Sequence, residues 1–222
     1  MKLFARSLLV LLLTATCASA DWVIVQKTTT EGQDKETVTK IKGEQARVDV
    51  GAEMSVIAGA EGMVVLMHTQ KMLMKMDLAT MRTALEMAAK AAAPLGNQPA
   101  AKPVATGQKE KVGEWEAEIY TWEGQMGKGR FWVAKDFPKF AEINAINDKL
   151  GKTMGNAMAG LAPQAADFNG MVVKSEMTMM GKNVSTLLVS AKEQEVDAKE
   201  FTAPAGYNEM KMPMLPGGAP PK

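Results

Sequence analysis

The residues with the most distinctive chemistry in this chain are its methionines. There are 19 in 222 residues, and all but Met1 follow residue 20. Many alternate with other residues, as do Met72, Met74 and Met76, the pair Met177 and Met179, and those at 210, 212 and 214. Thioethers are soft ligands that suit Cu(I), and methionine is also an adaptable filler of apolar cavities and binding surfaces. Copper sites usually add histidines, so the pattern favours the lining of an apolar cavity over a metal site.

Histidine chemistry in this chain depends on one residue, His68, at the end of a predicted strand. General acid–base catalysis by histidine, a Ser-His-Asp arrangement and a His-rich zinc site would all need it. The sequence holds no G-x-S-x-G, H-E-x-x-H or G-x-x-x-x-G-K-[ST] motif. We therefore interpret His68 as a surface or turn residue and predict a non-enzymatic protein without a cofactor. The alternative metal site comprises Met72, Met74, Met76 and His68.

Carboxylates and apolar residues alternate between Glu114 and Ile119. One face of this predicted strand carries Glu114, Glu116 and Glu118, and the other carries Trp115, Ala117 and Ile119. Three carboxylates in a row could hold a metal ion, but such a row is also typical of a solvated sheet face paired with bases across the strand. We expect Lys128 and Arg130 to be those bases, and Trp115 and Ile119 to face the interior.

The remaining pattern predicts the elements that must position these residues. Short β-branched or alternating segments separated by turns every 8–12 residues, between 22 and 76, predict an antiparallel meander or barrel. Asp77 is a good N-cap for a helix that Pro94 ends, and residues 94–108 are predicted to form a mobile loop. An aromatic hairpin follows, and Asp136 caps a second helix that continues to Leu161. Two strands between 171 and 191 come next, and residues 208–222 form a Pro- and Gly-rich disordered tail.

The first twenty residues predict export. Lys2 and Arg6, an apolar run, and the small residues before Asp21 form a secretory signal peptide cleaved after Ala20. A lipid-anchored Cys17 is the weaker alternative, because threonines occupy the positions where a lipobox needs Leu-like and small residues. Cleavage leaves no cysteine, so a hydrophobic core must stabilise the fold.

Charge and hydrophobicity limit the partners of the mature chain. Removing Lys2 and Arg6 with the leader leaves 24 basic against 25 acidic residues. No basic run of the kind that tracks phosphates is present, so we predict no nucleic-acid partner. No later segment is apolar over the length that a membrane span needs. The expected location is the periplasm or the extracellular space, with the protein as a monomer.

Three motifs carry a resemblance to a known family. They are the segments 111–120 (KVGEWEAEIY), 131–136 (FWVAKD) and 201–207 (FTAPAGY), in that order after a signal peptide, several strands and a helix. This arrangement resembles the LolA/LolB-like superfamily of bacterial periplasmic lipoprotein carriers, and most closely one of its uncharacterised domain-of-unknown-function branches. The resemblance extends over nearly the whole mature chain, residues 21–207.

The resemblance implies a mostly β fold with two helices: a strongly curved antiparallel sheet, an unclosed half-barrel, covered by the helices. It also implies a space for acyl chains between sheet and helices, with lipid or a lipidated partner as ligand. The candidate cavity residues are Met63, Val65, Met72, Met74, Met76, Trp115, Ile119, Met177 and Met179. The alternatives are a Cu(I)-binding protein and a cell-envelope structural or interaction module without a ligand.

Overall fold

The structure is a computed structural model that describes residues 21–81, 83, 101–124, 127–153, 163–179 and 181–210. The predicted signal peptide, with Cys17, lies outside the described residues. So do residues 94–100 of the predicted loop, the end of each predicted helix and residues 211–222. In the part of the chain that is described, no helix is long and apolar enough to cross a membrane.

Twelve strands form one sheet in the described residues. In chain order they are β1 (Trp22–Thr30), β2 (Gln33–Lys42), β3 (Gln45–Val50), β4 (Met54–Gly59), β5 (Gly62–Met67), β6 (Met72–Asp77), β7 (Val104–Val112), β8 (Trp115–Gly124), β9 (Gly127–Ala134), β10 (Met171–Met179), β11 (Lys182–Glu193) and β12 (Asn208–Glu209). Their spatial order is β12-β6-β5-β4-β3-β2-β1-β11-β10-β9-β8-β7. All neighbouring pairs are antiparallel except β12 with β6.

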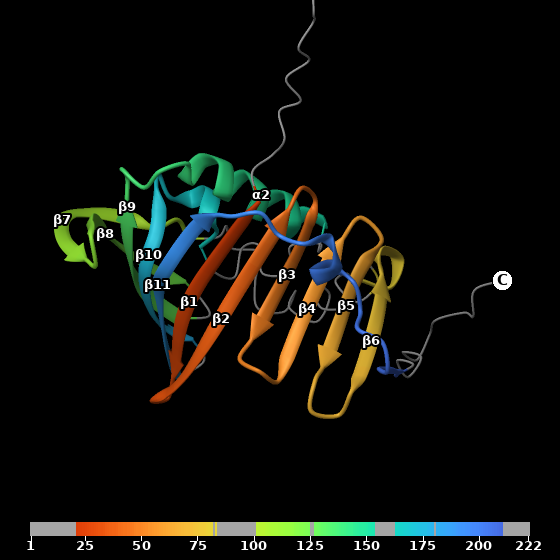
Figure 1. Cartoon of the computed structure of the whole chain (residues 1–222). Helices are drawn as coiled ribbons and strands as arrows, with labels where there is room; N and C mark the ends of the chain where they lie inside the picture. Colours follow the sequence, from red (N-terminus) through yellow and green to blue (C-terminus); the bar gives the residue numbers. More distant parts are fainter. Residues whose placement is uncertain are drawn as a thin grey trace, which may run out of the picture.

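The sheet is curved and does not close, because β12 and β7 are its two edges (Figure 1). The predicted fold class, mostly β with an unclosed antiparallel sheet and helices, is confirmed in this respect. Its hairpins follow from local chemistry. Glu31 and Gly32 both have positive φ, 50° and 82°, the geometry of a two-residue turn whose twist matches the flanking strands.

Helix α2 (Phe140–Thr153) begins later than the sequence pattern predicted. Asp136 does not cap it, because Lys139 adopts a left-handed φ of 55° and the helical turns start only after it. Phe137 is instead 4% exposed and belongs to the core. The predicted cap of the first helix is confirmed: the Thr80 backbone N–H donates to Asp77 Oδ1 at 2.7 Å, and residues 78–81 are helical.

Two segments predicted to be irregular are strands. Residues 104–108 belong to β7 and not to a mobile loop, and Asn208–Glu209 form β12 in place of the start of a disordered tail. Both are edge strands with exposed side chains, so they carry no hydrophobic alternation that a sequence pattern would reveal. Backbone pairing holds them instead. The N–H groups of Asn208 and Met210 donate to the carbonyls of Lys71 and Leu73 at 2.9 and 2.7 Å.

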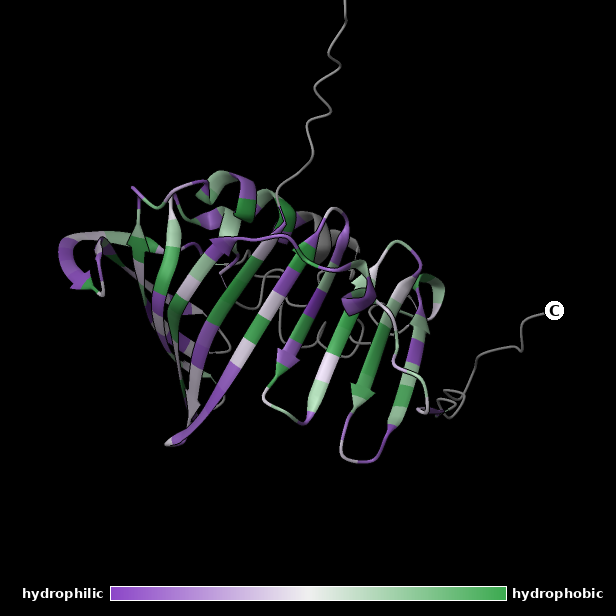
Figure 2. Ribbon diagram, viewed as in Figure 1, coloured by the Kyte–Doolittle hydropathy of each residue, from purple (hydrophilic) through white to green (hydrophobic). Residues whose placement is uncertain are grey.

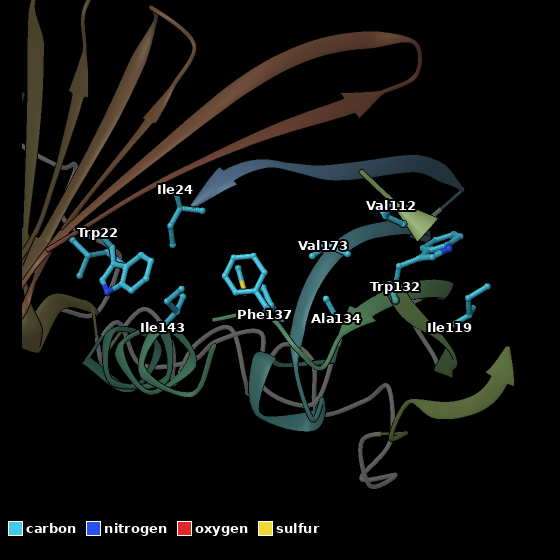
Figure 3. Close-up of a cluster of buried hydrophobic side chains, with 12 residues drawn as sticks. Trp22, Ile24, Val112, Ile119, Trp132, Ala134, Phe137, Ile143 and Val173 are labelled. Carbon is cyan, nitrogen blue, oxygen red and sulfur yellow. The ribbon is translucent and has the colours of Figure 1, made fainter. Parts of the chain in front are cut away.

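The main core lies where α2 meets the sheet. Ile143 of α2 is fully buried against a cluster that contains Trp22, Ile24 and Ile41 of β1 and β2. Figure 3 shows Phe137 between this end of the cluster and the end formed by Trp132 and Ile119. A separate cluster of Trp122, Phe131, Val133 and Phe168 lies near β8 and β9.

The segment 194–210, which we call the strap, follows β11 and crosses the sheet. It includes a 3₁₀ turn, η3 (Ala198–Phe201), and the short strand β12. In Figure 1 the strap runs in blue across the front of the first six strands, whereas α2 lies behind the sheet. The other 3₁₀ turn, η2 (Ala165–Asp167), packs beside α2.

Candidate ligand-binding site

The register of β4, β5 and β6 brings methionines from three strands onto one face. Val56 lies opposite Val65, which lies opposite Met74, and the neighbouring rows are Ala58–Met63–Met76 and Met54–Met67–Met72. Side chains alternate between faces along a strand, so these nine residues share a face, which we call the methionine face. It contains every methionine of the three strands.

This face is apolar but incompletely covered. Met54 is 36% exposed, and the other five methionines of the face are half-buried. Ala58, at the end of one row, is only 4% exposed. The face is therefore well covered at Ala58 and less covered at the methionines, whose side chains are flexible and apolar.

The same face continues across the sheet to the core under α2. Ala58 lies opposite Ala46, Ala46 opposite Ile41, and Ile41 opposite Trp22. This single row thus connects the methionines of β5 and β6 with the buried cluster against α2. Figure 2 shows the alternation of hydrophobic and hydrophilic bands along these strands.

The opposite face of β4–β6 is closed by the strap, and we call it the strap face. Its buried apolar residues are Ile57, Leu66 and Leu73, between 0 and 7% exposed, which pack with the partly buried Val64 against Val196, Phe201 and the partly buried Tyr207 of the strap. No methionine of β4–β6 lies on this face. The two faces of the same three strands therefore differ in both composition and cover.

A polar network connects the strap to the strap face. The Tyr207 hydroxyl lies 2.6 Å from His68 Nδ1, and His68 Nε2 lies 2.6 Å from the hydroxyl of Ser55, which is 1% exposed. Ser55 in turn donates to Asp49 Oδ1 at 2.5 Å, and Arg47 pairs with Asp49 and donates to the Glu200 carbonyl at 3.0 Å.

The network lowers the pKa of its carboxylate, Asp49. Burial opposes ionisation of Asp49, but hydrogen bonds from Ser55 and Arg47 and the charges of Arg47 and Lys40 outweigh it and hold the pKa of Asp49 below its usual value. His68 lies in the turn after β5, as the sequence predicted, and is a half-buried connector in this network. Asp49 contacts Ser55 and not His68, so the arrangement differs from a Ser-His-Asp triad.

The structure does not bring together all nine predicted cavity residues. Met63, Val65, Met72, Met74 and Met76 share the methionine face, as predicted. Trp115 and Ile119 belong to the core cluster, where the Trp115 ring lies 4.7 Å from that of Phe137. Trp115 therefore contacts the segment that leads into α2.

Met177 and Met179 lie in β10, far from β6 in the sheet order. Met177 lines a separate open cleft of about 1060 Å³ with Trp122, Val104 and several charged residues, among them Arg130 and Glu176. The alternative metal set also separates, because the ring of His68 faces Ser55 on the strap face whereas Met72, Met74 and Met76 lie on the other.

The carboxylate row of β8 is paired with bases, although not with the predicted ones. Lys109 of β7 pairs with Glu116, and Lys135 pairs with Glu118 at 2.6 Å. The β8–β9 register instead sets Lys128 opposite Glu123, and Arg130 pairs with Glu176. In the described residues no group of three or more His, Cys, Asp or Glu side chains is placed to hold a metal ion.

Some residues of the site were missed by sequence reasoning. Met54 and Met67 form one row of the methionine face with Met72. Neither belongs to an alternating run of methionines, so the sequence pattern did not indicate them. His68 binds Tyr207 of the strap, 139 residues away in the sequence, and Ser55 binds Arg47 and Asp49 of the neighbouring strand β3. Only the register of the sheet reveals these neighbours.

A family model described as a domain of unknown function, DUF4412, matches residues 23–207. The chain belongs to this family. No curated protein matches it. Among solved structures, an uncharacterized conserved protein from Thermus thermophilus is 9% identical, with 86% of this chain and 90% of that chain covered and a TM-score of 0.50, which shows a shared fold.

The Mycobacterium tuberculosis lipoprotein LppX is also similar, at 8% identity over 79% of this chain and 88% of its own, but its TM-score of 0.41 is too low to carry an argument. The expectation of an uncharacterised family is thus met. The specific relation to lipoprotein carriers stays a prediction.

Proposed function

We propose that this protein is an exported, non-enzymatic carrier or receptor that binds an apolar ligand, a lipid or a lipidated partner, on the methionine face. One observation carries the proposal. The six methionines of β4–β6 all lie on the less covered face, whereas the Leu and Ile residues of the other face are buried beneath the strap. A surface that only had to stabilise the fold would gain nothing from this segregation. A surface that must adapt to a flexible acyl chain gains from unbranched, polarisable side chains.

The energetics suit such a ligand. Burying an acyl chain contributes about 0.8 kcal/mol per CH₂ group. The methionine-bearing part of the face is three strands wide, roughly 10 Å at the usual strand spacing, and Met72–Met76 extend roughly 13 Å along β6. The face can therefore hold a stretch of an acyl chain in contact with the sheet. The helices would cover the bound chain from the other side.

Two measurements test the proposal. Native mass spectrometry of protein purified from its own cell envelope should reveal a co-purifying lipid, and an apolar fluorescent probe should bind with micromolar or better affinity. Met74→Glu introduces a charge into the centre of the methionine face and should reduce probe binding at least tenfold. Gln70→Glu adds the same charge in the exposed turn before β6, outside the methionine face, and is the matched control that should bind as the wild type does. Equal binding by both variants would contradict the proposal.

A second candidate function, Cu(I) binding, is favoured by one specific observation. Met54, Met67 and Met72 lie side by side on three adjacent strands, and thioethers are suitable ligands for Cu(I). Anaerobic titration with Cu(I) against a chromophoric competitor tests it. Sub-micromolar binding that is lost in Met67→Leu would favour the metal, because leucine preserves the apolar surface but removes a sulfur ligand.

A further inference from the structure

The short strand β12 brings the end of the strap to the methionine face. In its parallel register with β6, Asn208 lies opposite Met72 and Glu209 opposite Leu73. The Met210 N–H donates to the Leu73 carbonyl at 2.7 Å, so the pairing continues as far as Met210. Because side chains alternate along a strand, Asn208 and Met210 lie on the side of Met72, and Glu209 lies on the side of Leu73.

The side-chain contacts of the strap agree with this alternation. Glu209 Oε2 pairs with Lys75 Nζ at 2.7 Å, and the Tyr207 hydroxyl reaches His68 on the strap face. Glu209 is exposed, whereas Met210 is half-buried. The odd-numbered residues at the end of the strap therefore belong to the strap face, and the even-numbered residues belong to the methionine face.

The outer edge of β6 is only partly covered. β12 pairs with Met72 and Leu73, and within the described ranges no other strand lies on that side of residues 74–77 (Figure 1). The N–H and C=O groups of an unpaired sheet edge are a template for a further strand. The chain after Met210 starts directly at this edge, because the Met210 N–H is already bonded to β6.

The four residues that follow Met210 suit this edge; they are Lys211, Met212, Pro213 and Met214. The N–H groups of residues 208 and 210 point to β6, so in the same register the odd-numbered Pro213, which has no N–H, would leave no bond to β6 unmade. Pro216 is even-numbered and would interrupt the pairing. β6 itself ends at Asp77. The register therefore fits a strand that continues to Met214 and stops there.

From this register we infer that residues 211–214 continue β12 along β6 and add Met212 and Met214 to the methionine face as part of the ligand site. Met212 then lies opposite Met76 by the register of β12. The role in binding rests on the proposed function. A fourth strand widens the methionine-bearing surface to roughly 14 Å at the usual strand spacing, so that a longer stretch of an acyl chain can lie across it.

A disulfide measures the strand independently of any ligand. From residue 21 onwards the chain has no cysteine, so Met76→Cys combined with Met212→Cys introduces a single pair. Residues paired across neighbouring strands are close enough for a disulfide and side chains on opposite faces are not, so under mild oxidation this pair should close about tenfold faster than Met76→Cys combined with Lys211→Cys. Equal rates, or no disulfide in either protein, would overturn the strand.

Amide hydrogen exchange of the unmodified chain keeps the test valid if the cysteine variants fold poorly. In the continued register the Met212 N–H donates to the Lys75 carbonyl and should be protected from exchange. The Lys211 N–H points away from β6 and should exchange freely. Equal exchange of the two amides would overturn the strand.

The contribution to binding is tested with the apolar fluorescent probe. Met212→Glu should bind the probe about fivefold more weakly, because a carboxylate is costly in an apolar contact, whereas Lys211→Glu should bind it as the wild type does. Equal binding by the two variants would place Met212 outside the ligand site and overturn its role there. Failure of the wild type to bind the probe would instead overturn the proposed function, and the disulfide and exchange results, which need no ligand, would still decide the strand.

Discussion

The two faces of β4, β5 and β6 are built from the same three strands but differ in composition and in cover. On the strap face, Ile57, Leu66 and Leu73 are nearly inaccessible beneath Phe201 and Tyr207, and a hydrogen-bond network fixes the strap. On the methionine face, six of the nine side chains are methionines, which are long, unbranched and only partly buried. Branched side chains pack with defined rotamers, whereas methionine fills irregular space. The comparison teaches that one sheet can carry a face packed in defined rotamers and, on its other side, a face of adaptable side chains.

The largest difference between the faces should appear in stability. Leu66 is fully buried on the strap face, and its neighbour Met67 is half-buried on the methionine face. We expect Leu66→Ala to lower the free energy of unfolding by about 2–5 kcal/mol, because it leaves a cavity under the strap, and Met67→Ala to cost roughly 1 kcal/mol. Denaturant unfolding measures both. Similar losses in the two variants would contradict the division between the faces.

The polar network should give the next largest effect. Ser55→Ala removes the hydroxyl that bridges His68 and Asp49 and leaves both without that partner in a buried site. We expect a loss of about 1–3 kcal/mol in unfolding free energy. Tyr207→Phe removes only the terminal hydrogen bond and should cost about 0.5–1.5 kcal/mol. Limited proteolysis within residues 194–210 should accelerate in the same order, and an unchanged rate in Ser55→Ala would show that the network does not hold the strap.

Acid should weaken the strap face selectively. The pKa of Asp49 is lower in the folded protein than its value of 3.8 for an unperturbed group. A carboxyl with a depressed folded pKa contributes stability that is fully present above the unfolded pKa and is lost as the pH falls through the folded pKa. Hydrogen exchange of the strap amides should therefore increase below about pH 4 beyond the intrinsic pH dependence. In Asp49→Asn this additional pH dependence should decrease, and the remainder belongs to Asp21, which accepts from the Val196 N–H of the strap and also has a lowered pKa. An unchanged pH dependence would show that Asp49 does not contribute to it.

Oxidation should distinguish the faces with little effect on global stability. Thioether oxidation by peroxide follows exposure, so the six methionines of the methionine face should form sulfoxides before Met171, which is 7% exposed in the core. Peptide mass spectrometry after brief peroxide treatment measures the order. An acyl ligand should protect the methionine face and leave other methionines unchanged. Faster oxidation of Met171 would mean that the methionine face is more covered than its exposure indicates.

Much of this arrangement was predictable from the sequence, for physical reasons that particular residues illustrate. The alternation of Met72, Met74 and Met76 predicted one strand face, and Asp77 predicted the helix start, since both signals are local. Val104 and Asn208 were predicted wrongly to lie outside the sheet, because an edge strand needs only backbone pairing and carries no hydrophobic pattern.

The candidate site was less predictable than the strands that form it. Met54, Met67 and Met72 become neighbours only through the register of three strands, and Tyr207 reaches His68 only through the path of the strap. Met177 and Met179 alternate in the sequence as the methionines of β6 do, but they lie in β10, far from the methionine face in the sheet order. The same local pattern therefore does not place residues in the same site. The difference in cover between the two faces is a tertiary property that no single segment encodes.

The central claim, that the methionine face binds an apolar acyl ligand, is tested most directly by photo-crosslinking with a fatty acid that carries a diazirine on its chain, followed by mapping to single residues. The account predicts crosslinks at Met63, Met67, Met74 and their neighbours on the methionine face, and their loss on competition with unlabelled fatty acid. Crosslinks concentrated on Leu66, Leu73 or the strap, or in the cleft beside Met177, would contradict it.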